Sequence, residues 1–146
     1  GGAGQGWQDD DFAWSYDLPF AFPLYGVEYQ SVLVSSNGFL HFAGDGDPAN
    51  YANSEFELSQ NGRIAPLWTD LRTTAPDYDV FVEAQDDWVS FRWSAAAYGS
   101  DAPVNVAATL FADGAIRFDY GDGNQDLAPA IGISAVRRLM LCTRCR

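Results

Sequence analysis

A stretch of acidic and amide side chains late in the chain could hold a metal ion. Asp119, Asp122, Asn124 and Asp126 offer oxygen atoms in close succession, and calcium takes about six to eight oxygen ligands. Leu127 stands where an EF-hand loop carries glycine, and no glutamate closes the loop, so the stretch is not an EF-hand. Calcium is therefore a candidate cofactor, and a plain acidic turn without a metal is the alternative.

Catalytic groups are harder to find. His41 is the only histidine and lies in a strand-like run beside Phe39, which favours a packed or surface role. No G-x-S-x-G turn presents a nucleophile, and nothing selects one catalytic pair among the 20 acidic residues. We therefore expect no enzymatic activity. Asp45 and Asp47, in the connection after this run, form a second and weaker calcium candidate.

Aromatic residues are abundant, with 5 Trp, 7 Tyr and 10 Phe, which is more than one core usually needs. Trp68 and Trp93 fall in patterns typical of buried strands, so we expect them in the core. Trp88 and Tyr98 lie near predicted turns, where exposed rings could stack on sugars or cover a partner protein. These two are the candidate ligand-binding residues, with ordinary packing as the alternative.

The two cysteines, Cys142 and Cys145, form a C-x-x-C pair close to the end of the sequence. A structural zinc site needs four ligands, and the chain offers only these two and the remote His41. A redox C-x-x-C pair is expected near a βαβ pattern, which this sequence lacks. From the residues alone, a local disulfide, pairing between chains and free thiols all remain open.

Charge is unevenly distributed along the 146 residues. The net charge is −12, with 20 acidic residues against eight arginines and no lysine. Nucleic acid is therefore not an expected partner, because phosphate contacts need basic side chains. No apolar run is long enough to span a membrane, and the length fits one domain. Four arginines lie in the last ten residues: Arg137, Arg138, Arg144 and Arg146.

Alternating apolar and polar residues, interrupted by glycine-containing turns, predict an all-β protein. Asn37-Gly38 separates two β-prone runs and Asp113-Gly114 separates two more, and both dipeptides favour tight hairpin turns. A long acidic connection spans 43–62, with a short helical turn predicted at 54–58. We expect an antiparallel, jelly-roll-like β-sandwich of about nine or ten strands with little or no helix.

Several blocks of the chain resemble the nidogen-like domain. They are LPFAFPLYGVEYQSVLVSSNGFLHF, RIAPLWTDL, VSFRW, VAATLFADGAIRFDYGD and AIGIS, and together they span about residues 18–134. The resemblance implies a secreted, non-enzymatic β-sandwich, and it offers no catalytic residues to carry over. The structural roles that it does imply fall on the two turns and on the middle block: Asn37, Gly38, Pro66, Trp68, Asp113 and Gly114.

The resemblance also implies an extracellular location, where a disulfide between Cys142 and Cys145 is favoured. The extent of the resemblance divides the chain into three segments. An N-terminal arm with the first strand occupies 1–17, the nidogen-like sandwich occupies 18–135, and a basic tail occupies 136–146. The first six residues of the arm, 1–6, are rich in glycine and are expected to be flexible.

The lead hypothesis is a structural or adhesive module that assembles, through its ends, with copies of itself or with another extracellular protein. The arm could add as a strand to a neighbour's sheet edge, and the basic tail could dock on an acidic body. The alternative is a calcium-supported carbohydrate-binding or targeting module of a secreted hydrolase, with a glycan as partner. The residues assigned to assembly are Trp7, Phe12, Trp14, Arg137, Arg138, Arg144 and Arg146.

Overall fold

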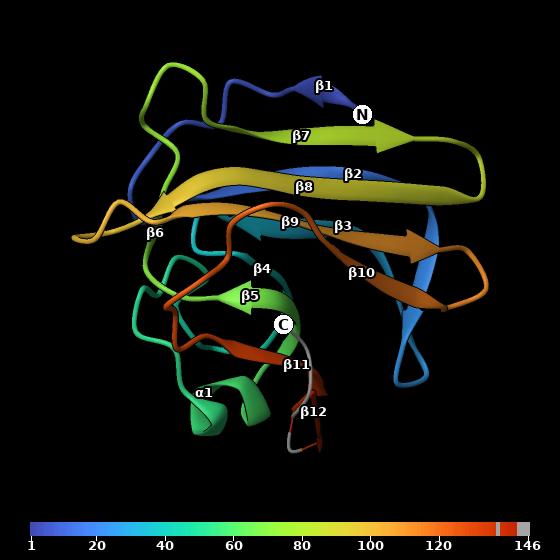
Figure 1. Ribbon diagram of the computed structural model, residues 1–146. Helices are drawn as coiled ribbons and strands as arrows, with labels where there is room; N and C mark the ends of the chain where they lie inside the picture. Colours follow the sequence, from blue (N-terminus) through green and yellow to red (C-terminus); the bar gives the residue numbers. More distant parts are fainter. Residues whose placement is uncertain (137, 143–146) are drawn as a thin grey trace.

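The computed structural model, which describes residues 1–136 and 138–142, is a sandwich of two antiparallel six-stranded sheets (Figure 1). Sheet A contains β1 (Ala3–Gly4), β6 (Leu71–Arg72), β7 (Asp79–Ala84), β8 (Trp88–Ala97), β9 (Pro103–Phe111) and β10 (Ile116–Tyr120). Sheet B contains β2 (Ala13–Leu24), β3 (Val27–Ser35), β4 (Phe39–Ala43), β5 (Gly62–Trp68), β11 (Ala130–Ala135) and β12 (Arg138–Leu141). The predicted all-β sandwich is confirmed.

Most neighbouring strands are also consecutive in sequence. Sheet A has the order β1-β7-β8-β9-β10, with β6 also paired to β8, and sheet B has the order β12-β11-β5-β4-β3-β2. The described residues form twelve strands instead of nine or ten. The difference comes from β1 and β6, which have two residues each and leave no alternation to detect, and from β12, which lies in the segment interpreted as a tail.

The main core lies between the two sheets. In β8, Val89, Phe91 and Trp93 are fully buried and alternate with less buried residues, as the period-two pattern predicts. The indole Nε1 of Trp93 donates a 2.7 Å hydrogen bond to the Ser35 carbonyl oxygen, so the polar end of this buried ring has a partner. The core therefore buries large rings without leaving this indole donor unpaired.

Sheet B is covered on its second face as well. The helix α1 (Glu55–Ser59) begins at Ser54, whose side chain accepts a hydrogen bond from the Glu57 N–H, and it buries Leu58. Leu58 joins a second, smaller core with Phe39 and Trp68. Every residue of β5 is consequently buried. Helix α1 is the short helical turn predicted in the long acidic connection.

The N-terminal arm is bound to the edge of sheet A. Ala3 and Gly4 pair with β7, and the Trp7 N–H donates a 2.8 Å hydrogen bond to Asp79 Oδ1. The Trp7 ring stacks on Trp14 with 5.5 Å between ring centroids and 3° between ring planes. The arm is thus a built-in part of the sandwich, and β2 continues without a break across the boundary placed at 17–18.

The C-terminal segment extends sheet B through β12, which pairs with β11. Cys142 is disulfide-bonded, and its N–H donates a 3.1 Å hydrogen bond to the Ile131 carbonyl oxygen. Cys145 and three of the tail arginines, Arg137, Arg144 and Arg146, lie outside the described residues, as does the side chain of Arg138.

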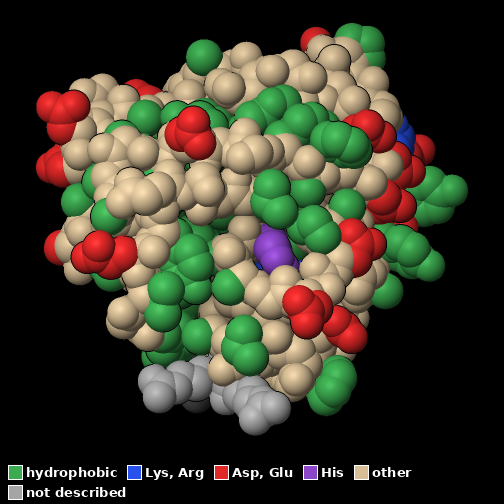
Figure 2. Space-filling model, turned by 180° about the vertical axis from the view of Figure 1, so that it is seen from behind, with side chains coloured by type: hydrophobic (Ala, Val, Ile, Leu, Met, Phe, Trp, Pro, Cys, Tyr) green, Lys and Arg blue, Asp and Glu red, His purple; other side chains and the backbone are tan. Residues whose placement is uncertain are grey.

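His41 is nearly buried, with 6% of its surface exposed. Figure 2 shows the single histidine at the bottom of a hollow in the back face of the molecule. Acidic side chains are scattered around this face, and no acidic group contacts the imidazole in a hydrogen bond among the described residues.

Replacing Gly38 with alanine is expected to destabilise the fold by more than about 3 kcal/mol or to prevent folding. Gly38 has a φ of +83°, and an added Cβ would overlap the carbonyl oxygen of Leu67. Gly26 has a similar φ of +79° but no atom within 4 Å of the added Cβ, so Gly26→Ala should cost only about 1–2 kcal/mol. Urea denaturation of both variants measures the difference, and equal losses would contradict the close approach at Gly38.

Candidate functional site

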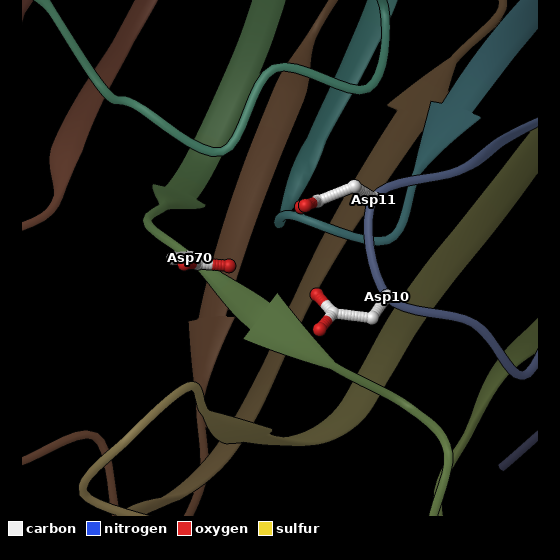
Figure 3. A group of neighbouring side chains, drawn as sticks. All are labelled: Asp10, Asp11 and Asp70. Carbon is white, nitrogen blue, oxygen red and sulfur yellow. The ribbon is translucent and has the colours of Figure 1, made fainter.

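Three aspartates from distant parts of the chain meet at one end of the sandwich. Asp10 and Asp11 lie in the arm between β1 and β2, and Asp70 lies in the link from β5 to β6. Each offers a carboxylate oxygen within 4.8 Å of the others, and the side chains point toward a common centre (Figure 3). In the part of the chain that the structure describes, no other three acidic, histidine or cysteine side chains are gathered this closely.

Backbone contacts of the arm bring Asp10 and Asp11 to this position. Asp9 N–H donates to Thr73 Oγ1 at 2.9 Å, Thr73 N–H donates to the Asp9 carbonyl oxygen at 3.0 Å, and Asp10 forms an antiparallel bridge with Arg72. Asp11 then adopts a left-handed backbone conformation with φ 63°, which aspartate tolerates better than most residues. This turn redirects the chain from sheet A into β2.

The buried side chain of Asn37 connects the three segments around the aspartates. Its Nδ2 donates to Asp11 Oδ1 at 2.9 Å and to the Ala49 carbonyl oxygen at 3.0 Å. Its Oδ1 accepts a 2.9 Å hydrogen bond from the N–H of Leu71, the residue after Asp70. The carboxamide therefore fixes Asp11, the backbone beside Asp70 and the 44–54 loop at once.

The aspartates carry more negative charge than their surroundings neutralise. Burial, followed by the nearby carboxylates of Asp11 and Asp10, raises the pKa of Asp70 to about 6. The pKa of Asp10 is also raised, first by burial and then by Asp11 and Asp9, with Arg72 acting in the opposite direction. Arg72 is itself paired with Asp101. The nearest cation is therefore engaged elsewhere.

Two carboxylate oxygens in the group have no hydrogen-bond partner. Oδ1 of Asp10 and Oδ1 of Asp70 are both buried and unpaired, whereas Oδ1 of Asp11 accepts from Asn37. A buried carboxylate oxygen without a partner is costly and requires a specific explanation. A bound cation is one arrangement that would satisfy both oxygens.

The aspartates line a hollow of about 330 Å³, which we name the acidic hollow. Its other walls are Tyr51, from the 44–54 loop, and Tyr98, which follows β8. The two rings are 56% and 62% exposed. Tyr98 is tied to the aspartates because its N–H donates a 2.8 Å hydrogen bond to the Asp70 carbonyl oxygen. An entering ligand would therefore meet the carboxylates and both rings together.

The calcium-binding residues predicted from the sequence do not line the acidic hollow. Asp119 accepts a 2.8 Å hydrogen bond from Arg117 Nε. The Asn124 carboxamide donates to the Asn105 carbonyl oxygen at 3.0 Å and accepts from the Asn105 N–H at 2.9 Å, so it closes the loop after β10. Asp122 and Asp126 are exposed, and the structure does not gather them with Asp119 into a group of ligands.

Two other predicted site residues, Asp47 and Trp88, also lie away from the acidic hollow. Asp47 Oδ1 accepts from the Ala49 N–H at 2.9 Å within its own loop. Trp88 lines a different hollow, of about 190 Å³, with Thr109, Phe111 and Arg117. Of the two candidate ligand-binding residues, only Tyr98 thus lies at the acidic hollow.

The predicted turns lie where the sequence places them. Asn37 and Gly38 join β3 to β4, and Asp113 and Gly114 join β9 to β10. Asp113 Oδ1 accepts a 2.9 Å hydrogen bond from the Ala115 N–H, which braces the second turn locally. Asn37 instead makes contacts far along the chain, so the first turn also organises the candidate site.

The sequence contained a weak signal for the three aspartates. Asp10 and Asp11 belong to a run of three aspartates, and Asp70 lies two residues after the predicted buried strand in the block RIAPLWTDL. Neither feature indicates that the two segments meet. Their proximity depends on the arm crossing from sheet A to sheet B, which local patterns do not encode.

Without added metal, Asp70→Asn should be more stable than the wild-type protein by about 1–3 kcal/mol at pH 7.5. The folded-state pKa of Asp70 is raised to about 6, so the wild-type fold gains stability from this group as pH falls from about 7 to 4. The advantage of the variant should therefore disappear near pH 4. Urea denaturation in chelator at both pH values measures this difference in the free energy of unfolding. Asp86→Asn, in the exposed β7–β8 turn, is the control, and a less stable Asp70→Asn protein at pH 7.5 would contradict the charge argument.

A family model described as NIDO related matches residues 3–141, which extends the resemblance seen at 18–134 into the arm and β12. No curated protein and no solved structure matches the chain. Nidogen-like domains are structural modules that are extracellular in general. None of the described helices is long and apolar enough to cross a membrane. Because the match covers nearly the whole chain, the protein belongs to the NIDO related family and its sandwich is a nidogen-like domain.

Proposed function

We propose that this nidogen-like domain is a non-enzymatic extracellular module that binds calcium in the acidic hollow and uses the ion to hold a ligand at the rim. The observation that carries the proposal is the pair of buried, unpaired Oδ1 atoms on Asp10 and Asp70. Together with Asp11, they place three carboxylates around one centre. A divalent cation there would offset the burial and the mutual repulsion that together raise the pKa of Asp70.

The donor set favours calcium over other common metals. All three side chains offer oxygen, and the group contains neither histidine nor cysteine, the ligands that zinc prefers. With one carboxylate oxygen each, the three aspartates supply fewer ligands than the roughly six to eight oxygens that calcium takes. The remaining positions would be filled by water or by oxygens of a ligand.

The rim suits a neutral saccharide better than an anionic ligand. Three carboxylates outweigh the charge of one calcium ion, and the whole chain carries a net charge of −12. An anion therefore gains no attraction from the loaded site. Sugar hydroxyls can complete the coordination of calcium, and the exposed rings of Tyr51 and Tyr98 offer apolar faces against which a sugar ring packs.

Self-assembly through the arm is a second candidate function. The arm is held to the edge strand β7 by the pairs Ala3–Val82 and Gly4–Phe81 and by the 3.1 Å hydrogen bond from Gln5 N–H to the Val80 carbonyl oxygen. These backbone contacts do not depend on which copy supplies the arm. Exchange of arms between copies would give dimers or, if repeated without closure, filaments.

Calcium titration by calorimetry tests the first proposal. We expect a dissociation constant of about 10⁻⁴–10⁻³ M, as for other extracellular modules, and a loss of at least about tenfold in affinity for Asp10→Asn and Asp70→Asn. Asp122→Asn, in the stretch first predicted to bind calcium, should bind like the wild-type protein. The absence of binding, or a loss confined to Asp122→Asn, would overturn the assignment.

Ligand binding can be tested with an array of neutral and acidic glycans in calcium and in chelator. We expect hits among neutral glycans that disappear in chelator and weaken at least about tenfold in Tyr98→Ala, because one stacking ring is lost. Trp88→Ala, on the separate hollow, should retain them. Hits that survive chelation, or that depend on Trp88, would place the ligand elsewhere.

Light scattering over a range of concentrations tests assembly through the arm. If arms are exchanged, the full chain should show oligomers, and a deletion of residues 1–6 should be monomeric because β7 loses its added strand. The deletion retains Trp7 and the aspartates. An unchanged particle size after the deletion, or a monomeric full chain at every concentration, would rule out this route.

A further inference from the structure

A buried arginine lies behind the 44–54 loop. Arg63, on β5, has no exposed surface, and its guanidinium lies over the rings of Phe39 and Trp68 at 4.5 and 5.1 Å from their centroids. Among the described residues, no carboxylate lies within ion-pair distance of it. A buried cation without an acidic partner depends on its remaining hydrogen bonds and on the aromatic faces.

One of those hydrogen bonds goes to the only histidine. Arg63 Nε donates to His41 Nδ1 at 3.0 Å. Because an imidazole nitrogen that accepts a hydrogen bond carries no proton, His41 must be neutral in this arrangement. The backbone of Gly44 also acts on the imidazole, in the direction that raises its pKa. His41 therefore connects the arginine to the start of the 44–54 loop.

The same pair holds the loop at a second point. Arg63 Nη2 donates to the Asp47 carbonyl oxygen at 2.9 Å. Further along, the loop supplies the Ala49 carbonyl oxygen that accepts from Asn37, and then Tyr51, one wall of the acidic hollow. The position of this wall consequently depends on contacts made by Arg63 and His41.

The acidic groups around His41 and Arg63 do not restore the ordinary pKa values of these two side chains. Asp47, in the loop, acts on both His41 and Arg63, and Glu57, on α1, acts on Arg63. Burial, followed by Arg63, lowers the pKa of His41 to about 4, and burial lowers the pKa of Arg63 to about 10 despite both acids. A proton on His41 would thus place two cations side by side.

We propose that His41 and Arg63 form an acid-sensitive latch, in which protonation of His41 breaks the hydrogen bond from Arg63 and releases the 44–54 loop together with the Tyr51 wall of the acidic hollow. The latch itself depends only on the contacts of this pair. Its consequence for a bound ligand rests on the proposed function of the hollow.

The direction of the pH effect follows from the lowered pKa. The pKa of His41 is about 4 when the loop is closed, and we expect the ordinary value of about 6.5 when the loop is open. His41 therefore stabilises the closed loop above pH 6.5. This stabilisation of the closed loop is lost as the pH falls from about 6.5 to 4. Between pH 7.5 and pH 5, the equilibrium constant for opening should rise roughly 30-fold.

Hydrogen exchange of the 44–54 loop, measured without calcium or ligand and corrected for the intrinsic pH dependence of exchange, tests the latch. The wild-type loop should open about 30-fold more at pH 5 than at pH 7.5. In His41→Gln, whose amide oxygen can still accept from Arg63 but does not titrate, the change should be less than about threefold. An equal change in both proteins, or no change in the wild type, overturns the proposal.

A second measurement covers the case in which the glutamine variant does not fold. NMR titration of His41 in the wild-type protein should give a pKa well below 6.5, together with loop exchange that rises as the histidine titrates, and an ordinary pKa overturns the proposal. Both measurements omit calcium. Failure of calcium to bind would therefore remove the proposed function and leave the latch standing, whereas failure of the latch would leave calcium binding intact.

Discussion

The hydrogen bonds of the Asn37 carboxamide are the interaction on which the candidate site depends. They join Asp11, the backbone of Leu71 and the loop at Ala49, three segments that no regular strand pairing connects. The residue after Asn37 must be glycine, because the turn packs against the carbonyl oxygen of Leu67 at Gly38. A turn that fixes strand register thereby also assembles a group of carboxylates whose mutual repulsion opposes folding.

The fold was largely predictable because its strands carry local signals. The alternation of Val89, Phe91 and Trp93 and the turns at Asn37-Gly38 and Asp113-Gly114 each depend on a few neighbouring residues. The short strands β1 and β6 carry no such signal, because two residues cannot show a period. The arm was interpreted as flexible because glycine has no side chain to pack, yet its backbone completes the edge of sheet A.

The site was much less predictable, since its residues are joined by contacts across the chain. Counting oxygen atoms along the sequence led to Asp119, whose carboxylate accepts from Arg117, and to Asn124, whose carboxamide binds the Asn105 backbone. Asp10 and Asp70 have unremarkable neighbours and acquire their buried oxygens only when the arm docks beside β6. Tyr98, a candidate because it lies near a predicted turn, is an exposed ring in the structure, and exposure at a turn is a local property.

The docking of the arm also constrains the order in which the protein can mature during synthesis. The arm is synthesised well before the partners that hold it in place, as when the Gly6 N–H meets Asp79, 73 positions along the chain. Such contacts of long sequence separation form late in folding. Until β7 and β8 exist, the arm has no strand to pair with, and the acidic hollow lacks its Tyr98 wall.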